Sequence, residues 1–451
     1  MRALASLAVT ACALAVPRAA LHAQDAVTAA PPPARNVVVL LCDDAGYADF
    51  GFQDEPDPDL GPLTAHIDRI AKEGVRFTNA YTSGCVCGPT RAGLLTGRYQ
   101  QRFGFDRNIP QGYMGGGLEL EERTIADRMR EIGRATALVG KWHLGYPDAY
   151  HPNRRGFDEF FGFLMGARAY QPIENPTPHR AIQRNGEVQP ESGYVTDRWG
   201  DAAIEFIGKH EAKPFFLYVA FNAVHAPLQP KAEDLAAVAH IEPQRRRNYA
   251  GVMVGLDRAV GRILEALDER GLTESTLVIF TNDNGGQTQT GAINRPLRGR
   301  KAQLFEGGIR VPMAMRWPKR ITAGTTIRDP VITLDLLPTM IAACGGALDA
   351  KWQLDGVDLV PRITGTRESL DERTLFWRSQ GTTGPIAARR GDWKLLIQRG
   401  EPDAKPMLFD LRADVGERRD LAAQEPGKVA ELRAAIEAWE AQTVEPGWGN
   451  R

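Results

Sequence analysis

The sequence predicts an α/β protein in which a large, mainly parallel sheet is sandwiched by helices and is followed by a smaller C-terminal antiparallel sheet with one helix. Along most of the chain, short apolar runs alternate with helical patterns, as they do in parallel α/β proteins. From about Arg373 onward, short strand patterns follow one another between Gly, Pro and Asp turns. Hydrophobic residues make up 43% of the 451 residues, which is enough for a large core.

The predicted strands of the large sheet are residues 37–42, 75–80, 137–139, 215–221 and 277–281. Thr124 can cap a helix that ends at Gly133, and a longer helical pattern runs from Met253 to near Gly271. The antiparallel strands are predicted at residues 374–377, 385–388, 393–398 and 407–411. A last helix places Val429, Leu432, Ile436 and Trp439 on one face.

The N-terminus has the pattern of a secretory signal peptide. Arg2 precedes an almost wholly apolar run, and small residues allow a cut after Ala23. We therefore expect residues 1–23 to be removed, residues 24–35 to form a linker, 36–372 to form the main α/β domain and 373–451 to form a C-terminal subdomain. The protein is expected to be exported, periplasmic or secreted, with no membrane span. Lipid attachment at Cys12 is disfavoured because the apolar run continues past it.

Charge and cysteine content exclude several classes of protein. The 55 Lys and Arg residues balance the 56 Asp and Glu residues, and the basic runs 245–247 and 389–390 are interpreted as solvated faces, so no nucleic-acid partner is expected. The spacing of the cysteines after the signal resembles neither a disulfide framework nor a zinc site. We interpret Cys42 and Cys344 as buried thiols.

Polar residues follow each predicted strand of the large sheet. They are Asp43 and Asp44, the segment 85–97, Lys141 and His143, His225, and Asp283 and Asn284. Because ligands of open parallel sheets bind at the carboxyl ends of the strands, we expect these groups to meet in one crevice. Any one of them alone would also fit a solvated loop.

Asp43, Asp44, Asp283 and Asn284 offer hard oxygen donors without His or Cys, a set that suits calcium or magnesium rather than zinc. Either pair alone would also fit turn-forming residues at strand ends. The two pairs together with the motif that follows favour a metal site.

The segment 85–97 carries the most specific motif. Pro89 suits the first turn of a helix and Gly97 its end, so Cys87 would stand just before a helix N-terminus, which favours an anion. The segment resembles the signature C-x-P-S-R-x-x-x-L-T-G of type I, formylglycine-dependent sulfatases. Cys87, Pro89, Arg91 and residues 95–97 match, while Thr90 replaces the serine and keeps its hydroxyl. Cys85 lacks the Pro and Arg at the required offsets.

Further motifs in the order of this family cover nearly the whole chain after the signal. They are residues 43–46, 140–145, 156–158, 225–227, 282–285, Lys301 before Glu306-Gly-Gly, and 408–411. The chain thus resembles arylsulfatase-like members of the alkaline phosphatase superfamily. The resemblance implies an alkaline phosphatase-like fold, with residues 36–372 as the sulfatase domain.

The resemblance also implies the cofactors. A maturation enzyme would oxidise Cys87 to formylglycine (3-oxoalanine), whose hydrated aldehyde is the nucleophile. Calcium, rather than magnesium, would be held by Asp43, Asp44, Asp283 and Asn284 together with an oxygen of the modified Cys87.

The catalytic roles follow from the same resemblance. Arg91 and Lys141 would hold the hydrated aldehyde, and Lys141 and Lys301 would bind the sulfate group. His143 is the candidate base for sulfate release, and His225, helped by Lys301, is the candidate acid for the leaving oxygen. For a lone histidine, a hydrogen-bonded structural role is the alternative.

The expected function is hydrolysis of an organic sulfate monoester, and the substrate is a sulfated small molecule or a sulfated glycan. Export and an Arg- and His-bearing insert between Gly156 and Tyr194 favour the glycan. His151, His179 and Arg180 lie in loops that could line a substrate pocket or the surface. Two alternatives stay open: a phosphate or phosphonate ester hydrolase of the same superfamily, and a non-catalytic sulfate-glycan-binding relative in which Cys87 is unmodified. A two-zinc phosphatase is disfavoured because the metal set lacks His.

Overall fold

The computed structural model describes residues 32–401 and 404–448, so the predicted signal peptide and most of the predicted linker lie outside the described residues. The end of that linker already belongs to the fold, because Ala34 N–H donates to Ala343 O at 2.7 Å and Arg35 N–H to Ser275 O at 2.8 Å. Among the described residues, no helix combines the length and the apolar character that crossing a bilayer requires.

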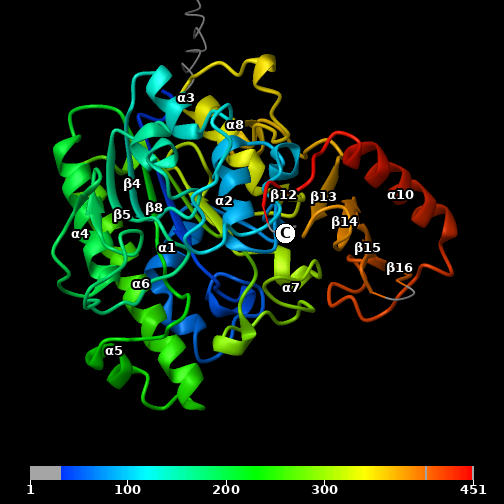
Figure 1. Cartoon of the computed structure of the whole chain (residues 1–451), viewed down its shortest axis with the longest axis horizontal. Helices are drawn as coiled ribbons and strands as arrows, with labels where there is room; N and C mark the ends of the chain where they lie inside the picture. Colours follow the sequence, from blue (N-terminus) through cyan, green and yellow to red (C-terminus); the bar gives the residue numbers. More distant parts are fainter. Residues whose placement is uncertain (1–31, 402–403, 449–451) are drawn as a thin grey trace, which may run out of the picture. The chain divides into compact units, whose positions relative to one another are not determined.

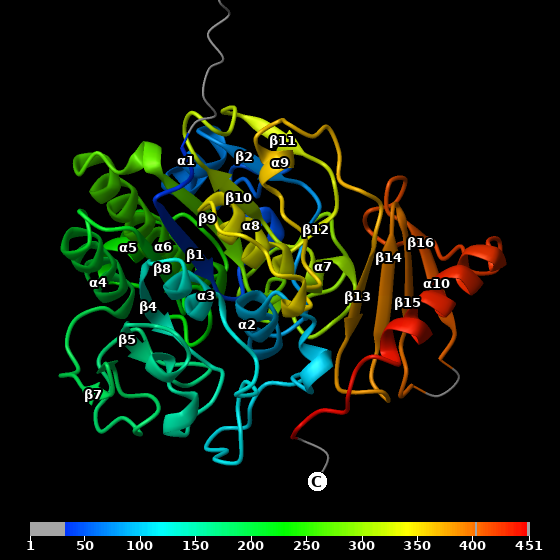
Figure 2. The same ribbon diagram turned by 90° about the horizontal axis from the view of Figure 1, so that it is seen from above.

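Ten strands form the main sheet, in the order β11-β2-β10-β9-β1-β8-β4-β5-β6-β7 (Figures 1 and 2). Their bounds, in that order, are Thr325–Ile327, Val75–Phe77, Met313–Arg316, Thr276–Asn282, Asn36–Cys42, Phe215–Ala220, Ala135–Lys141, Glu159–Phe163, Gln183–Arg184 and Glu187–Val188. The central strands β9, β1, β8, β4 and β5 are parallel, whereas β10, β6 and β7 run antiparallel to their neighbours. The predicted mainly parallel sheet is confirmed.

Helices cover both faces of this sheet (Figure 2). One group contains α1 (Ala65–Lys72), α4 (Val195–Lys209), α5 (Ala232–Ala237) and α6 (Gln244–Glu269), and the other contains α2 (Cys87–Thr96), α3 (Ile125–Glu131) and α8 (Leu336–Ala343). Thr124 caps α3 as predicted, accepting a hydrogen bond from Asp127 N–H. All seven residues of β1 are buried because helices lie on both sides of it.

The predicted strand at residues 75–80 is wrong as a single element. The chain leaves β2 after Phe77. Thr78 N–H then donates to the carbonyl of Ile327, the last residue of β11, and Asn79 Nδ2 donates to the carbonyl of the next residue, Arg328. The next residues form β3 (Ala80–Tyr81), which pairs with β12 (Val331–Ile332) in a separate two-stranded sheet. The segment that carries Cys87 therefore follows this small sheet and not a parallel strand of the main sheet.

The predicted C-terminal antiparallel sheet is confirmed. It contains β13 (Thr374–Arg378), β14 (Ile386–Arg390), β15 (Trp393–Ile397) and β16 (Pro406–Asp410), and α10 (Pro426–Glu440) packs on it (Figure 1). Leu432, Ile436 and Trp439 of α10 are buried, and Trp439 stacks on Phe376 at a ring-centroid distance of 5.1 Å. The domain division at residue 373 stays a prediction.

The interpretation of the two basic runs as solvated faces is wrong for one arginine in each run, Arg246 and Arg389. Arg246 is buried because its guanidinium pairs with Asp49 at 3.0 Å and with Asp57 at 2.8 Å. Arg389 is also buried and donates to the Tyr81 hydroxyl. Local charge patterning cannot reveal such partners, because Asp49 is distant from Arg246 in sequence.

Candidate active site

The carboxyl ends of β1 and β9 bring the four predicted oxygen donors together. The two strands are parallel neighbours with Cys42 paired to Asn282, so the residues that follow them emerge side by side. All four side chains are at most 3% exposed, and Asn284 Nδ2 donates to Asp44 Oδ1 at 2.8 Å. The predicted convergence is confirmed for this set.

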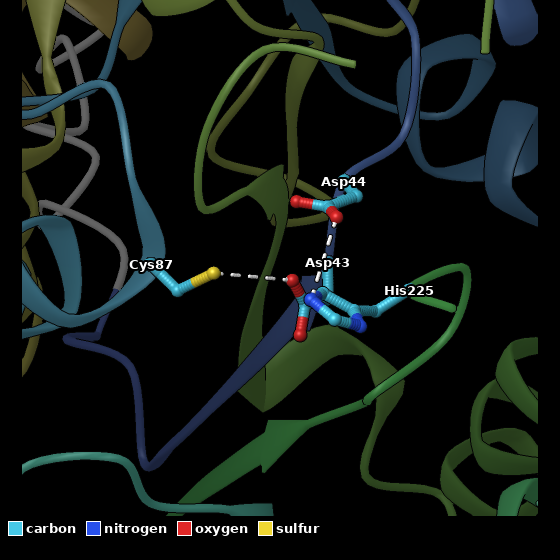
Figure 3. A group of neighbouring side chains, drawn as sticks. All are labelled: Asp43, Asp44, Cys87 and His225. Carbon is cyan, nitrogen blue, oxygen red and sulfur yellow. Dashed lines mark hydrogen bonds and ion pairs between the residues drawn. The ribbon is translucent and has the colours of Figure 1, made fainter. Parts of the chain in front are cut away.

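Two of these donors have an oxygen without a hydrogen-bond partner: Asp283 Oδ1 and Asn284 Oδ1 are both buried. A buried, unpartnered oxygen is unfavourable, and a hard cation would satisfy both atoms. A second grouping overlaps this one, since ligand atoms of Asp43, Asp44, Cys87 and His225 all lie within 4.8 Å of one another (Figure 3). The residues at this edge of the sheet therefore fit a metal ion.

Cys87 lies at the N-terminus of α2, as its first residue rather than just before the helix. Its thiol donates to Asp43 Oδ1 at 3.6 Å and lies 3.4 Å from Lys301 Nζ. Gly97 ends the helix in a left-handed conformation with φ of 67°. Burial, followed by the charges of Asp283 and Asp43, raises the pKa of Cys87 to about 12, so the unmodified thiol is neutral and a weak nucleophile.

Arg91, one helical turn after Cys87, is fixed from two sides. Its Nε and Nη2 donate to Asp283 Oδ2 at 3.0 and 2.9 Å, and its Nη1 donates to the backbone carbonyl of Lys141 at 3.1 Å. The guanidinium is 1% exposed. Arg91 thus connects α2 to the end of β4 and to the residue after β9.

The two predicted lysines pair with the two aspartates that follow β1. Lys141 Nζ lies 2.5 Å from Asp43 Oδ2, and Lys301 Nζ lies 2.7 Å from Asp44 Oδ1. Burial raises the pKa of both carboxyls. Lys141 together with His225 and Arg91 outweighs it at Asp43, and Lys301 together with His225 outweighs it at Asp44, so both pKa values fall below their ordinary value. Both aspartates are therefore ionised near neutral pH.

The His143 imidazole packs against the backbone of Gly166. A Cβ at Gly166 would lie 2.5 Å from His143 Nε2, so this contact requires a glycine. Burial, followed by the charges of Lys141 and Arg91, lowers the pKa of His143 well below its ordinary value. The imidazole is therefore neutral near pH 7, and its buried Nδ1 has no hydrogen-bond partner.

A backbone hydrogen bond places one proton of His225 on Nδ1. Its Nδ1 lies 2.7 Å from the carbonyl oxygen of Ala226, and because a carbonyl only accepts, Nδ1 must donate. Nε2 is left to face the site, 3.6 Å from Asp44 Oδ2 (Figure 3).

A cavity of about 250 Å³ opens onto these groups. Its lining includes the predicted residues Cys87, His143, His225 and Lys301, and also Arg180, which the sequence allowed either in a pocket or on the surface. The added residues are Asn108, Ile109, Gln111, Tyr146, Met165, Gly166 and Ala167. Most of the added residues come from loops that carry no strand-end signal, so sequence reasoning missed them. Asn108 is an example: its Oδ1 accepts from Gly88 N–H at 2.8 Å in the first turn of α2.

Other residues flagged in the sequence have structural roles. His151 is buried, contacts Gln183 Oε1 at 3.3 Å and packs on Phe160. Trp142 and Trp199 are buried in the hydrophobic core. A larger cavity of about 540 Å³ beside Arg310 and Arg389 contains none of the predicted site residues, so the smaller one is the candidate active site.

Comparisons with known proteins match most of the chain to one family. A family model described as "Sulfatase" matches residues 35–346, and a second, described as "N-sulphoglucosamine sulphohydrolase, C-terminal", matches residues 300–441. Arylsulfatase A of Homo sapiens is 32% identical over 94% of this chain and 90% of its own length. N-acetylgalactosamine-6-sulfatase of Canis lupus familiaris is 32% identical over 82% of this chain and 71% of its own length.

A solved structure is similar over the same extent. The crystal structure of Ps i-CgsB in complex with k-i-k-neocarrahexaose has a TM-score of 0.86 and 33% sequence identity, covering 93% of this chain and 95% of that one. The first family model alone spans more than half of the chain, and the relatives match most of it. The chain therefore belongs to the sulfatase family of the alkaline phosphatase superfamily and is an enzyme that hydrolyses sulfate esters.

Proposed function

We propose that this sulfatase releases inorganic sulfate from a sulfated carbohydrate, with a formylglycine formed from Cys87 and a calcium ion as its cofactors. The observation that carries the proposal is the position of Cys87. It stands at a helix N-terminus, 3.6 Å from Asp43 and 3.4 Å from Lys301, in a cavity that it shares with two histidines.

Calcium suits the donor set of Asp43, Asp44, Asp283 and Asn284, with an oxygen of the modified Cys87 as a further ligand. These side chains provide several protein oxygens in one place, as calcium sites do, whereas magnesium usually keeps several waters. The two unpartnered oxygens of Asp283 and Asn284 support the choice of a cation. A bound Ca²⁺ would supply positive charge against the sulfate oxygens.

Formylglycine suits the position of Cys87 because Lys301 contacts this side chain and Lys141 and Arg91 lie nearby. Its hydrate supplies two hydroxyls on one carbon, one as the nucleophile and one that allows sulfate to leave, whereas a serine has only one. Arg91, held by Asp283 and by the carbonyl of Lys141, would orient this group. Lys141 and Lys301 would neutralise the sulfate oxygens, which otherwise repel a nucleophile.

The two histidines fit opposite proton-transfer roles. His143 is neutral because its pKa is lowered, so it can accept the proton that accompanies sulfate release. His225 donates Nδ1–H to the Ala226 carbonyl and presents Nε2 to the cavity. As the doubly protonated imidazolium it would carry a second proton on Nε2, which it could give to the leaving alcohol oxygen. Lys301, between Asp44 and Cys87, would assist that step electrostatically.

A carbohydrate substrate is supported by the relatives. One is named for a sulfated N-acetylgalactosamine, and the similar crystal structure holds a neocarrahexaose. The signal-like N-terminus supports export to the periplasm or the medium, and formylglycine formation requires a maturation enzyme as a partner.

The test compares kcat/KM for a matched aryl sulfate and aryl phosphate, followed by sulfated mono- and oligosaccharides. The enzyme is produced in a host that has the maturation system, and Cys87→Ala serves as the inactive control. We expect the sulfate to be preferred and at least one sulfated sugar to be desulfated. Dominant phosphate turnover would favour the phosphatase alternative, and binding of sulfated sugars without turnover would favour the non-catalytic one.

A further inference from the structure

We propose that Arg180 forms a second anion subsite in the substrate cavity, which binds a carboxylate or an additional sulfate of the glycan beside the sulfate ester that is cleaved. This inference rests on the proposed carbohydrate substrate and names its class: a glycan with at least two anionic groups. Arg180 lines the same cavity as Cys87, His143 and Lys301.

The Arg180 guanidinium lacks a carboxylate partner within residues 32–401 and 404–448. Its Nε is buried and makes no hydrogen bond. Two neighbouring basic side chains do have carboxylate partners. Lys301, which also lines the cavity, pairs with Asp44 at 2.7 Å, and Arg168, which contacts the Arg180 carbonyl, pairs with Glu191 at 2.6 Å. A partly buried arginine that lines an active-site cavity and has no protein partner is suited to a ligand anion, because its planar fork can bind a carboxylate or sulfate with two parallel hydrogen bonds.

The backbone around Arg180 is held in place without any substrate. Arg180 N–H donates to Thr177 O at 2.9 Å, and the Arg180 carbonyl accepts from Arg168 Nη1 at 3.1 Å. The preceding carbonyl, of His179, accepts from Leu164 N–H at 3.0 Å and from Met165 N–H at 3.1 Å, just after β5. The segment is therefore anchored to the main sheet, which lowers the entropy lost when the side chain binds an anion.

A ring stack also ties Arg180 to the segment that carries the candidate base. His179 stacks on Tyr146 with ring centroids 4.9 Å apart and an interplanar angle of 19°. Tyr146 lines the cavity three residues after His143. The stack thus fixes the spacing between the reacting end of the cavity and Arg180, and that spacing would select where on the glycan the second anion must lie.

The experiment compares three disaccharides that carry the same cleavable sulfate: one with a neutral neighbouring sugar, one with a uronate carboxylate and one with a second sulfate. The measured quantity is the ratio of kcat/KM for each dianionic substrate to that for the monosulfated one. We expect Arg180→Met to lower this ratio about 10- to 100-fold, the size of a lost charge-assisted hydrogen bond, and Arg180→Lys to restore part of it. The substrate with the larger loss identifies carboxylate or sulfate as the ligand.

Arg184→Met is the matched control, because Arg184 follows closely in the chain, lies outside the cavity and pairs with Glu205 at 2.9 Å on the surface. It should leave the ratio unchanged. Arg180→Met ratios equal to those of the wild type would overturn the subsite. This includes the case in which kcat/KM falls by the same factor on all three substrates in a protein with unchanged Tm. Failure of the wild type to desulfate any of the three would instead count against the proposed carbohydrate substrate.

Discussion

Replacing Gly166 by alanine places a methyl group where the His143 imidazole lies. The new Cβ would be 2.5 Å from His143 Nε2 and 2.6 Å from Cε1, whereas favourable contacts between carbon atoms begin near 3.5 Å. The ring must therefore move by roughly 1 Å. It has little freedom to do so elsewhere, because His143 is 5% exposed and its N–H donates to Leu164 O at 3.1 Å.

A displacement of this size should act mainly on the chemistry. Misplacing a catalytic group by about 1 Å can lower the rate about 100-fold, so we predict a loss of that order in kcat for Gly166→Ala. The assay is the steady-state hydrolysis of an aryl sulfate at saturating substrate, with thermal unfolding measured on the same sample to confirm that the variant is folded.

Gly427→Ala provides the matched control, since no heavy atom lies within 4 Å of the Cβ that it would add. It lies in the first turn of α10 and should leave kcat unchanged while stabilising the protein by about 0.4–1 kcal/mol. A folded Gly166→Ala enzyme with kcat within about threefold of the wild type would refute the role given to the position of His143.

Three further predictions concern stability and the metal. Arg378→Met should lower the free energy of unfolding by about 3–5 kcal/mol in urea titrations, because Arg378 and Asp106 are both fully buried and 2.8 Å apart. The control is Arg390→Met, which removes a half-exposed arginine and should change that free energy by less than about 0.5 kcal/mol. A loss below about 1 kcal/mol for Arg378→Met would contradict this prediction. Burial raises the pKa of Glu306, but Lys394, Arg310 and Arg389 together outweigh burial and lower that pKa to about 2. The stabilisation is therefore complete above the unfolded-state pKa of about 4.3 and is lost as the pH falls from there through the folded-state pKa. Glu306→Gln should therefore flatten the acid limb of a Tm-against-pH profile, and an unaltered limb would exclude Glu306 as its source. Chelation with EGTA should abolish aryl sulfate turnover, and Ca²⁺ should restore it better than Mg²⁺; full activity in excess EGTA would argue against the metal.

The main sheet and the oxygen donors could be predicted because one rule places them. Parallel strands end at the same edge, so Asp43 and Asp283, which are remote in sequence, had to lie close once β1 and β9 were recognised as strands. The helix signals Pro89 and Gly97 predicted Cys87 at the start of a helix, one residue before the position that it takes as the first residue of α2. The metal-ligand and catalytic roles of these residues stay predictions.

The rest depends on contacts that local patterns do not encode. The predicted strand at 75–80 ends early, after Phe77, and Thr78 and Asn79 bond to Ile327 and Arg328, which are about 250 positions away. Asn108 and Gly166 reach the cavity through loops, where no periodicity indicates which residues line it. The burial of Arg246 likewise depends on Asp49, almost 200 residues earlier.

The chemical identity of residue 87 tests the central claim most directly. Mass spectrometry of the peptide that contains Cys87 should be performed on enzyme from a host with the maturation system, alongside its turnover of an aryl sulfate. We predict that the active enzyme carries an aldehyde in place of the thiol, and that turnover rises in proportion to the converted fraction. Full turnover by a protein whose Cys87 is entirely an unmodified thiol would contradict the account.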